Sequence, residues 1–543
     1  MEQQNVNNAK NTKLSVGEKI AYALGDASAN IAWRGVSTFL LIFYTDVFGL
    51  APAIAGLVLL VGRFTDGISD ILMGVVGDRT KSKYGHFRPW VLWTAIPLGV
   101  TLSLIFTAPD WSMDWKIAYA FITYVVFMVI YTANNVPYGS LMAVMTPDDK
   151  ERTSLSSYRM VGAFAGGMLV QGALLFLVAY FGNINPQVNV EKTADATYAV
   201  SFSAQSDFQK VKISTSDGIA QIAWADSLGV EGAQVTTSKN LSVSAGETYN
   251  FVVTGQEELS ADDITIIDQS RGYSHSIYLM SVILVIALLV TFRFTHERVQ
   301  PPADQKTDLK NDLKDLVHNK PWVVLLFVGL LFNIYNNIKQ GITVMYFSHY
   351  VHDQFLAATY MVLLMVASIG GAMLTTPLGN KMGKKNLFVM ALVTTGVINA
   401  LIAFCGPQDV SAIFAIGIAS EVFAAFLPTL FFAMLGDAAD YSEYVNGRRA
   451  TGLVYAAGSF ATKFGGGIAG AIIGGILGYF GYNGIDPSTY AGAQEGMVML
   501  MSWVPAIIVV LGAVVMLLYP LSQKKQSEIT AELEARRANA VNN

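Results

Sequence analysis

Residues Trp90 to Ala108 read WVLWTAIPLGVTLSLIFTA, an apolar run without a single charged residue. A second run, from Met499 to Pro520, has the same character. A transmembrane helix needs about 20 such residues to cross about 30 Å of hydrocarbon. The whole chain of 543 residues is 53% hydrophobic and only 14% charged, whereas roughly a quarter of the residues in soluble domains are charged. These runs therefore predict an integral membrane protein.

Apolar runs bounded by proline, glycine or charged residues predict twelve membrane helices. Their approximate ranges are 20-48, 53-77, 89-108, 115-145, 157-182, 274-295, 321-350, 355-379, 387-405, 411-436, 451-481 and 493-520. We expect an all-α membrane protein of twelve transmembrane helices in two six-helix halves. The N-terminal half takes 20-182 for helices 1-5 and 273-295 for helix 6, and the C-terminal half takes 321-520 for helices 7-12.

Lysine and arginine gather in alternate loops, which predicts how the chain is oriented. The segments rich in these residues are 78-88, 296-320 and 380-386. Short basic loops are retained in the cytoplasm. We therefore expect the linker 296-320 and both tails, 1-19 and 521-543, on the cytoplasmic side of a bacterial-type inner membrane. The first tail is polar and lacks the apolar core of a cleavable signal.

Residues 183-272, between the fifth and sixth predicted helices, do not fit the membrane pattern. They are rich in Ser, Thr, Asn and Asp, and they alternate apolar with polar residues from Thr197 to Phe202 and from Tyr249 to Val253. Such alternation is typical of half-buried strands. We expect a small β-rich insertion on the external face. It is either a passive cap or a module that captures oligosaccharides or docks a partner.

Charged residues inside membrane helices cost about 2.5–3.5 kcal/mol each, so each needs a partner, a cavity or a role. Asp66 and Asp70 lie four residues apart on one face of the second helix, one turn after Arg63. Their repulsion is relieved either by protonating one of them or by binding a cation between them. The Thr132 hydroxyl can add an oxygen ligand if the second and fourth helices meet. Alternatively, Arg63 and other basic residues merely neutralise the pair.

A wider set of polar residues predicts a central polar pathway. On the first helix Asp26, Asn30 and Arg34 recur every four residues and form one stripe. The others are Asn134, Asn135 and Pro137, which we expect to break the fourth helix, with Arg159, Lys339, Glu421 and Lys463. For each residue alone, an interhelical ion pair is an equal alternative. Glycines repeat every four residues from Gly466 to Gly478, a spacing that favours close helix packing over a hinge.

Several classes of protein are excluded. The sequence has no phosphate-binding P-loop, no HExxH metal motif and no GxSxG elbow, and its six histidines are not paired at ligand spacing. The single cysteine, Cys405, excludes a disulfide framework, and the net charge of -5 excludes a basic nucleic-acid binder. We therefore expect neither an enzyme nor a resident cofactor.

Four separated motifs carry a resemblance to a known family. They are Gly25-Asp26 followed by Phe43 to Asp46; Gly62 to Asp70; Asp78 to Thr80 with Gly85 to Trp90; and Gly436 to Tyr444 with Gly447 to Gly452. With these motifs the chain resembles the glycoside-pentoside-hexuronide:cation symporters of the major facilitator superfamily, the group that includes melibiose permease. The resemblance covers the chain apart from 183-272 and the tails.

The resemblance implies a cation site and a sugar site. The cation site comprises Asp66, Asp70 and Thr132, with Ser69 at a position where the family has asparagine. Two aspartates that hold sugar hydroxyls in melibiose permease correspond to Asn30 and Asn135, and its stacking tryptophan corresponds to Gly139. Arg159 matches the sugar-site arginine, and Lys463 matches the lysine near the carboxylate pair. Asp26, Arg34 and Lys339 complete the expected substrate set.

The function implied is symport of a glycoside or oligosaccharide with Na+ or H+ by alternating access. We expect a bilayer protein that works as a monomer, with a small-molecule sugar and a monovalent cation as partners and no nucleic acid. Because Arg34, Arg159, Lys339 and Lys463 make the expected sugar site more positive, a uronate-containing sugar is our hypothesis. A neutral pentoside or glycoside is the alternative.

Two other classes stay open, a sodium-dependent lysophospholipid symporter and a non-transporting sugar sensor. We also expect a cytoplasmic gate. Its residues are Arg79, Arg88, Asp440, Glu443, Arg448 and Arg449. They would pair when the transporter faces outward and separate when it faces inward.

Overall fold

A computed structural model describes residues 14–146, 149–184, 186–215, 221–224, 238–254, 258–298, 316–446 and 451–542. The chain divides into two compact units. The first comprises Met1–Pro301, Gly341–Val362 and Ala471–Met497, and the second comprises Pro302–Gln340, Leu363–Gly470 and Val498–Asn543. Among the described residues, nine helices are long and apolar enough to cross a membrane.

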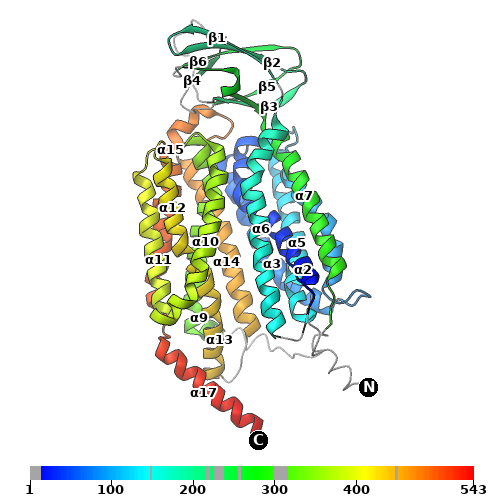
Figure 1. Ribbon diagram of the computed structural model, residues 1–543, viewed down its shortest axis with the longest axis vertical. Coiled ribbons are helices and arrows are strands. Elements are labelled where there is room, and N and C mark those ends of the chain that lie inside the picture. The colour runs from blue at the N-terminus through cyan, green and yellow to red at the C-terminus, as the bar shows by residue number, and fades with distance from the viewer. Residues whose placement is uncertain are drawn as a thin grey trace. The chain divides into compact units, whose positions relative to one another are not determined.

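Long helices make up most of the first unit (Figure 1). They are α2 (Val16–Ile42), α3 (Pro52–Arg79), α4 (Arg88–Ile105), α5 (Met113–Met145), α6 (Asp149–Gly182) and α7 (Gln269–Phe294). The Ser15 side chain caps α2 by accepting a hydrogen bond from the Glu18 N–H, and Pro52 opens α3, where a missing N–H costs nothing. A five-residue π-helical turn, η1 (Phe43–Val47), continues α2.

The fourth predicted helix corrects one expectation. The expected break at Asn134 to Pro137 is absent, because α5 runs without interruption from Met113 to Met145 with Pro137 inside it. A proline inside a transmembrane helix is tolerated where neighbouring groups satisfy the carbonyl that it leaves without a donor. The residues around it therefore keep helical spacing, and Thr132 and Asn135 lie three residues apart on α5.

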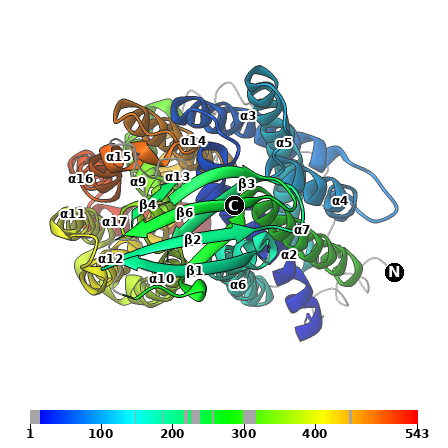
Figure 2. The same ribbon diagram turned by 90° about the horizontal axis from the view of Figure 1, so that it is seen from above.

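Seven strands lie between α6 and α7 in the part of the chain that the structure describes. They are β1 (Gln187–Ala194), β2 (Thr197–Ser203), β3 (Phe208–Thr215), β4 (Gln221–Trp224), β5 (Ser238–Val243), β6 (Thr248–Thr254) and β7 (Ile264–Asp268), and a 3-10 turn, η3 (Ala261–Asp263), precedes β7. They form a four-stranded sheet in the order β1-β2-β6-β4 and a three-stranded sheet in the order β5-β3-β7, both antiparallel (Figure 2). The alternating stretches noted in the sequence lie in β2 and β6, which pair Val200 with Phe251.

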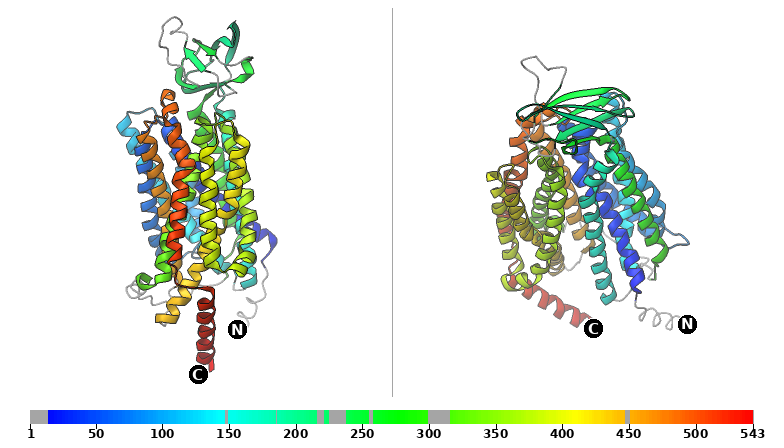
Figure 3. Two further views of the ribbon diagram at one scale, coloured as in Figure 1. Left: turned by 90° about the vertical axis from the view of Figure 1, so that its left-hand side faces the viewer. Right: turned by 45° about the horizontal axis from the view of Figure 1, so that its top comes forward.

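These strands, which we call the β-module, share one apolar core beyond the ends of α6 and α7 (Figure 3). Its buried side chains come from both sheets and include Val200, Phe202, Phe251, Val253, Val211, Ile213, Ile264 and Ile266. Asp268 ends β7 and caps α7 by accepting a hydrogen bond of 3.1 Å from the Arg271 N–H. The β-module is therefore joined directly to the start of α7.

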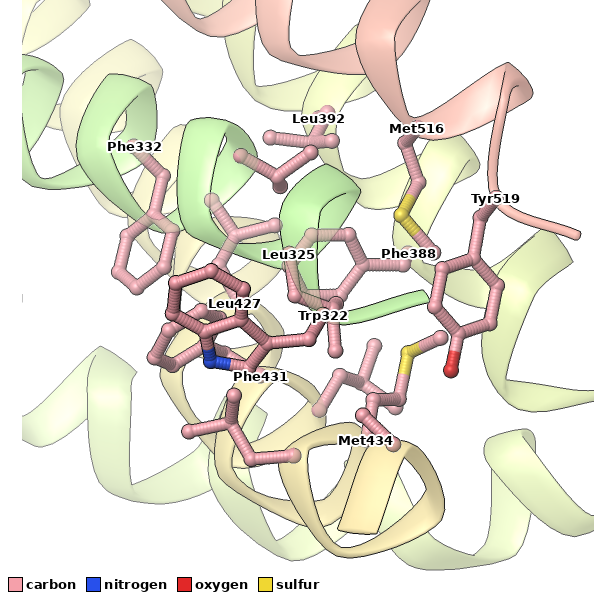
Figure 4. Packing of buried hydrophobic residues seen from close by; sticks show 14 of the residues in the cluster. Trp322, Leu325, Phe332, Phe388, Leu392, Leu427, Phe431, Met434, Met516 and Tyr519 are labelled. Atoms are coloured by element: carbon pink, nitrogen blue, oxygen red, sulfur yellow. The ribbon is translucent and has the colours of Figure 1, made fainter. Parts of the chain in front are cut away.

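The second unit contains the remaining helices. The helices that lie in it wholly or in part are α9 (Lys320–His349), α10 (Gln354–Met382), α11 (Lys384–Ala400), α12 (Val410–Ala424), α13 (Phe426–Asn446), α14 (Thr451–Tyr479), α15 (Tyr490–Met501), α16 (Trp503–Leu517) and α17 (Gln523–Asn542); short 3-10 turns are η4 (Leu401–Phe404) in this unit and η5 (Pro487–Thr489) in the first. Figure 4 shows its core, where Trp322, Phe388, Phe431 and Met516 pack together.

The outer faces of the helices expose apolar side chains that a bilayer would cover. On α4, Trp93, Ile96 and Val100 are 51%, 61% and 52% exposed and follow one another at helical spacing. Soluble proteins rarely expose such a continuous apolar face. The remaining face of α4 packs against α5 and α7, which leaves polar side chains only in the interior.

Candidate functional site

The predicted cation-site residues lie on α3 and α5, which pack against each other. Asp66 is fully buried, and its Oδ1 accepts a hydrogen bond of 2.5 Å from the Thr132 hydroxyl, which is also fully buried. Asp70 lies one turn further along α3 and is half-buried. The Ser69 hydroxyl donates to the backbone carbonyl of Asp66 over 3.0 Å. The region therefore presents two carboxylates and two hydroxyls, an oxygen set that suits a hard monovalent cation.

An aromatic pair from α2 and α5 borders these carboxylates. The guanidinium of Arg63 lies 3.8 Å from the centre of the Trp33 ring, and Trp33 stacks on Tyr131 with ring centres 5.6 Å apart. A cation over an aromatic face is stabilised by the ring's electron density. Arg63 is thus held by an aromatic ring, one turn before Asp66.

The polar stripe of α2 is engaged by α6. Nε of Arg159 lies 3.0 Å from Oδ2 of Asp26, in a largely buried ion pair. Beside it, Tyr22 and Tyr138 stack with ring centres 4.8 Å apart, and each hydroxyl donates to the other residue's carbonyl, over 3.3 and 2.6 Å. The Arg159 guanidinium also lies 5.6 Å from the Tyr138 ring centre. Two residues of the expected substrate set, Asp26 and Arg159, are therefore brought together.

The asparagines differ in their surroundings. The Asn134 amide donates to the Thr94 hydroxyl over 2.7 Å and is buried against α4. Asn135, the next residue, is half-buried on a different side of α5. Asn30 is also half-buried, and its amide donates to the Asp26 carbonyl one turn earlier over 3.0 Å. Arg34 follows it as a half-buried residue on α2.

The second unit gives Lys339 surroundings that the sequence did not predict. Its buried ammonium donates to the carbonyl of Met501 over 3.2 Å, and the amide of Asn399 donates to the carbonyls of Met501 and Ser502 over 3.1 and 2.9 Å. α15 ends at Met501, so these donors satisfy carbonyls at a helix C-terminus. Lys339 therefore has a helix-capping contact, and its place in the substrate set stays a prediction.

The other expected residues of this unit lie on α12 and α14. Lys463 is half-buried on α14. Glu421, half-buried on α12, accepts a short hydrogen bond from the Ser368 hydroxyl of α10.

Comparison with known proteins decides the family. A model of the family described as MFS/sugar transport protein matches residues 21–204 and 238–523. The chain belongs to this family. The inner membrane symporter YicJ of Escherichia coli strain K12 is 29% identical over 93% of this chain and 92% of that protein. The isoprimeverose transporter of Lactiplantibacillus pentosus is 29% identical over 96% of this chain and 92% of that protein.

The fold of this MFS protein agrees with solved transporters. A bacterial homologue of the human lysosomal transporter Spinster, in an inward-facing and unoccupied conformation, matches with a TM-score of 0.59 at 14% identity and covers 94% of this chain and 100% of that chain. The chain is therefore a multi-pass membrane transporter of the MFS fold, and it is not an enzyme.

The predicted gate residues of this MFS transporter are divided between the two units. Arg88 donates to the Phe292 carbonyl over 2.7 Å, so its guanidinium is engaged within the first unit. Arg79 is exposed at the end of α3, and Asp440 and Glu443 are half-buried on α13. Arg448 and Arg449 lie outside the described residues. The predicted pairing between these groups stays a prediction.

Sequence reasoning missed how the chain after α7 fastens the helix ends. Glu297 accepts hydrogen bonds from the backbone N–H groups of His86, Phe87 and Arg88 over 2.8, 2.8 and 2.9 Å. A carboxylate is well placed there, because the N-terminus of a helix carries a partial positive charge. Arg298 pairs bidentately with Glu18 over 2.7 and 2.9 Å. The sequence analysis also did not single out Trp33, Tyr131 or Tyr22, or a buried cluster around Asp46.

Proposed function

We propose that this transporter carries a neutral glycoside together with a monovalent cation bound at Asp66 and Asp70. One observation carries the proposal: the Thr132 hydroxyl of α5 meets the fully buried Asp66 carboxylate of α3, one turn before Asp70. A buried carboxylate inside a membrane is costly unless it is paired or has a role in transport. This hydrogen bond supports a site in which a bound cation neutralises the negative charge of the two carboxylates.

The donor set supports a cation as the coupling partner. The Thr132 hydroxyl donates a hydrogen bond to Asp66, and the Ser69 hydroxyl donates one to a backbone carbonyl. Each hydroxyl oxygen retains lone pairs that can bind a cation. Neutral oxygens beside carboxylates suit Na+, whereas H+ needs only the carboxylates. We therefore favour Na+ and keep H+ as the alternative. Whatever the cation, its binding must strengthen sugar binding to the same degree that the sugar strengthens cation binding.

The Asp26–Arg159 pair changes our view of the sugar. Arg159 was one reason to expect a uronate, but its guanidinium already contacts the Asp26 carboxylate. The carboxylate accepts hydrogen bonds and the guanidinium donates them. Together they complement sugar hydroxyls, each of which can both donate and accept a hydrogen bond. The half-buried amides Asn30 and Asn135 add further groups of this kind. We therefore prefer a neutral glycoside over a uronide.

The topology that we propose has twelve spans and alternating access. The helices α2 to α7 supply six spans, and α9 to α16 supply six more if α12 with α13 and α15 with α16 each cross once. We place both termini on the cytoplasmic side of the inner membrane and the β-module on the external side. The reason is that the basic loops 78-88 and 380-386 both fall at the ends of the spans away from the β-module, and basic loops are retained in the cytoplasm. The protein would work as a monomer.

Uptake by the purified protein in liposomes tests this function. Labelled neutral glycosides and a glucuronide are offered with an inward Na+ gradient, an inward H+ gradient or neither. We expect Asp66→Ala and Asp70→Ala to abolish cation-driven uptake, and Asp114→Ala, an exposed aspartate in the first turn of α5, to retain it. Gradient-driven accumulation by either site variant at the parent's level would reject the cation site, and preference for the glucuronide would reject the neutral substrate.

A further inference from the structure

The first unit contains a buried ionisable cluster that neither the cation site nor the sugar site uses. Asp46, in the π-helical turn η1, is buried, and its carboxylate accepts three hydrogen bonds. The Thr45 hydroxyl donates to Oδ1 over 2.7 Å, the Tyr482 hydroxyl donates to Oδ1 over 2.6 Å, and Nε2 of His349 lies 2.7 Å from Oδ2. Hydrogen bonds to an ionised group are about twice as strong as neutral ones. We call Asp46, His349, Tyr482 and Tyr490 the Asp46 cluster.

The cluster joins segments that are far apart in the chain. Asp46 belongs to the N-terminal half, whereas His349 ends α9 and Tyr482 follows α14 in the C-terminal half. Tyr490 completes it, with its ring centre 4.1 Å from that of His349 and its hydroxyl donating to the Gly484 carbonyl over 2.7 Å. The two halves therefore touch through the hydrogen bond between Asp46 and His349 and through its hydrogen-bonded neighbours.

Two glycines show how closely the halves approach each other here. A Cβ atom on Gly484 would lie 2.5 Å from Oδ1 of Asp46 and from the Thr45 carbonyl oxygen. A Cβ atom on Gly474 of α14 would lie 2.3 Å from the Pro52 carbonyl oxygen at the start of α3. Real Cβ atoms do not come this close to backbone oxygen atoms. Only residues without a side chain permit this approach, and it occurs both at the Asp46 cluster and at the start of α3.

The β-module reaches the same place. β5 packs against η5, which immediately precedes Tyr490. Burial lowers the pKa of the Lys212 ammonium on β3, and the negative charge of Asp46 opposes that shift. The other titratable or charged side chains facing the cluster are His352, Tyr273 and Asp486. The β-module therefore meets this region where β5 packs against η5, and Lys212 of β3 is a cation within electrostatic range of Asp46.

We propose that the Asp46 cluster holds the external end of the transport path closed, and that the β-module is fastened to it where β5 packs against η5, with the positive charge of Lys212 adding to this attachment. The inference rests on the proposed function, because alternating access requires the two halves to part at this end once in each cycle. Asp46 and His349 are then positioning residues: they touch neither sugar nor cation, and they set how often the external end opens. The β-module is part of this closure and more than a passive cap.

Labelling of a reporter cysteine tests the closure. Cys405 is the only native cysteine, so Cys405→Ala gives a cysteine-free parent. In this parent Ser37→Cys, nine residues before Asp46, reports how accessible that position of α2 is from the external solution. Right-side-out vesicles are exposed to a membrane-impermeant maleimide. We expect Asp46→Asn and His349→Ala each to raise the labelling rate about tenfold or more, since each removes a charge-assisted hydrogen bond. Maximal uptake rate falls in parallel, because the closed state is reached less often.

Conservative and matched variants separate closure from general damage. His349→Gln keeps an N–H donor and should restore a labelling rate near the parent's. Gly474→Leu prevents the close approach and should raise the rate, and Lys212→Gln should raise it about threefold. His275→Ala and Lys192→Gln remove exposed residues of the same types and should leave it unchanged.

The inference fails if Asp46→Asn and His349→Ala, folded as judged by thermal unfolding, label at the parent's rate. A parent rate in Lys212→Gln would overturn the role given to Lys212. Failure of the proposed function looks different, because the parent would then carry no sugar with any cation, whatever its labelling rate.

Discussion

Replacing Thr132 by valine removes one hydroxyl from the proposed cation site and keeps the size and branching of the side chain. Thr132 is fully buried, with Oγ1 2.5 Å from Oδ1 of Asp66. A hydrogen bond to a charged group contributes about 1.5–3 kcal/mol, and about 1.4 kcal/mol corresponds to tenfold in affinity. If the hydroxyl also ligates the cation, the cation concentration for half-maximal uptake should rise between roughly tenfold and hundredfold.

The assay is sugar uptake into liposomes over a series of external Na+ concentrations, with the same series repeated for H+. Thr132→Ser keeps the hydroxyl and should remain close to the parent. Thr94→Val is the matched control, since Thr94 is a buried threonine on α4 that accepts a 2.7 Å hydrogen bond from the Asn134 amide and donates to the Trp90 carbonyl over 2.6 Å. It should lower the unfolding temperature without changing the cation dependence. A Thr132→Val protein that is folded and has the parent's cation dependence would refute the reasoning.

Three further changes probe other parts of the molecule. Arg159→Lys keeps the charge but loses the planar fork, so sugar affinity at saturating cation should fall about tenfold; an unchanged uptake curve would argue against a sugar role. Glu297→Gln weakens the cap on α4 and should reduce the free energy of unfolding by about 1–2 kcal/mol in thermal unfolding, with exposed Glu247→Gln as the control. Lys339→Met should lower the unfolding temperature, because it removes the contact with the Met501 carbonyl, and leave the choice of sugar unchanged; an altered choice would support the predicted substrate role of Lys339.

Hydropathy was sufficient to predict long membrane-spanning helices, because the bilayer imposes one requirement on every span. The run from Trp90 to Ala108 corresponds to α4. The charge-poor composition identified a membrane protein, whereas the transporter family was predicted from the four motifs. The break expected at Pro137 was wrong, because proline signals an interruption in water-soluble helices more strongly than inside a membrane. Local sequence therefore predicts where a span lies better than it predicts the shape of that span.

The site was predictable only where helical spacing carries the information. The spacing of Asp66 and Asp70, with Thr132 opposite them, could be inferred because carboxylates in a membrane stand out. Trp33 and Tyr131 could not, since aromatic residues in a membrane helix look like lipid-facing residues until a contact such as Arg63 over Trp33 is seen. Lys339 was assigned to the sugar because a buried lysine stands out, yet the carbonyls it satisfies at Met501 have no sequence signature.

The Asp46 cluster is the extreme case of this limit. Asp46 lies 303 positions from His349 and 436 from Tyr482 along the chain. No periodicity connects residues at such separations, and a single sequence offers only the presence of an aspartate near a helix end. Of the two glycines that permit the approach, Gly474 belongs to the repeat that the sequence analysis interpreted as packing, and packing is what the structure has there. Gly484 lies outside that repeat.

Two helices, α3 and α2, connect the cation site to the Asp46 cluster, which gives coupling a physical route. Asp66 lies on α3, and Arg63 of the same helix is held by Trp33 of α2; α2 then continues through η1 to Asp46. A cation can shift the opening equilibrium only by its difference in affinity for the open and closed states. Neutralising the Asp66–Asp70 pair changes the field around Arg63 and hence its hold on Trp33. The π-helical turn is a short, irregular element of the kind often found at functional sites, and a small rotation of α2 there would move Asp46 relative to His349. If this route operates, saturating cation should change the Ser37→Cys labelling rate in the parent and not in Asp66→Ala.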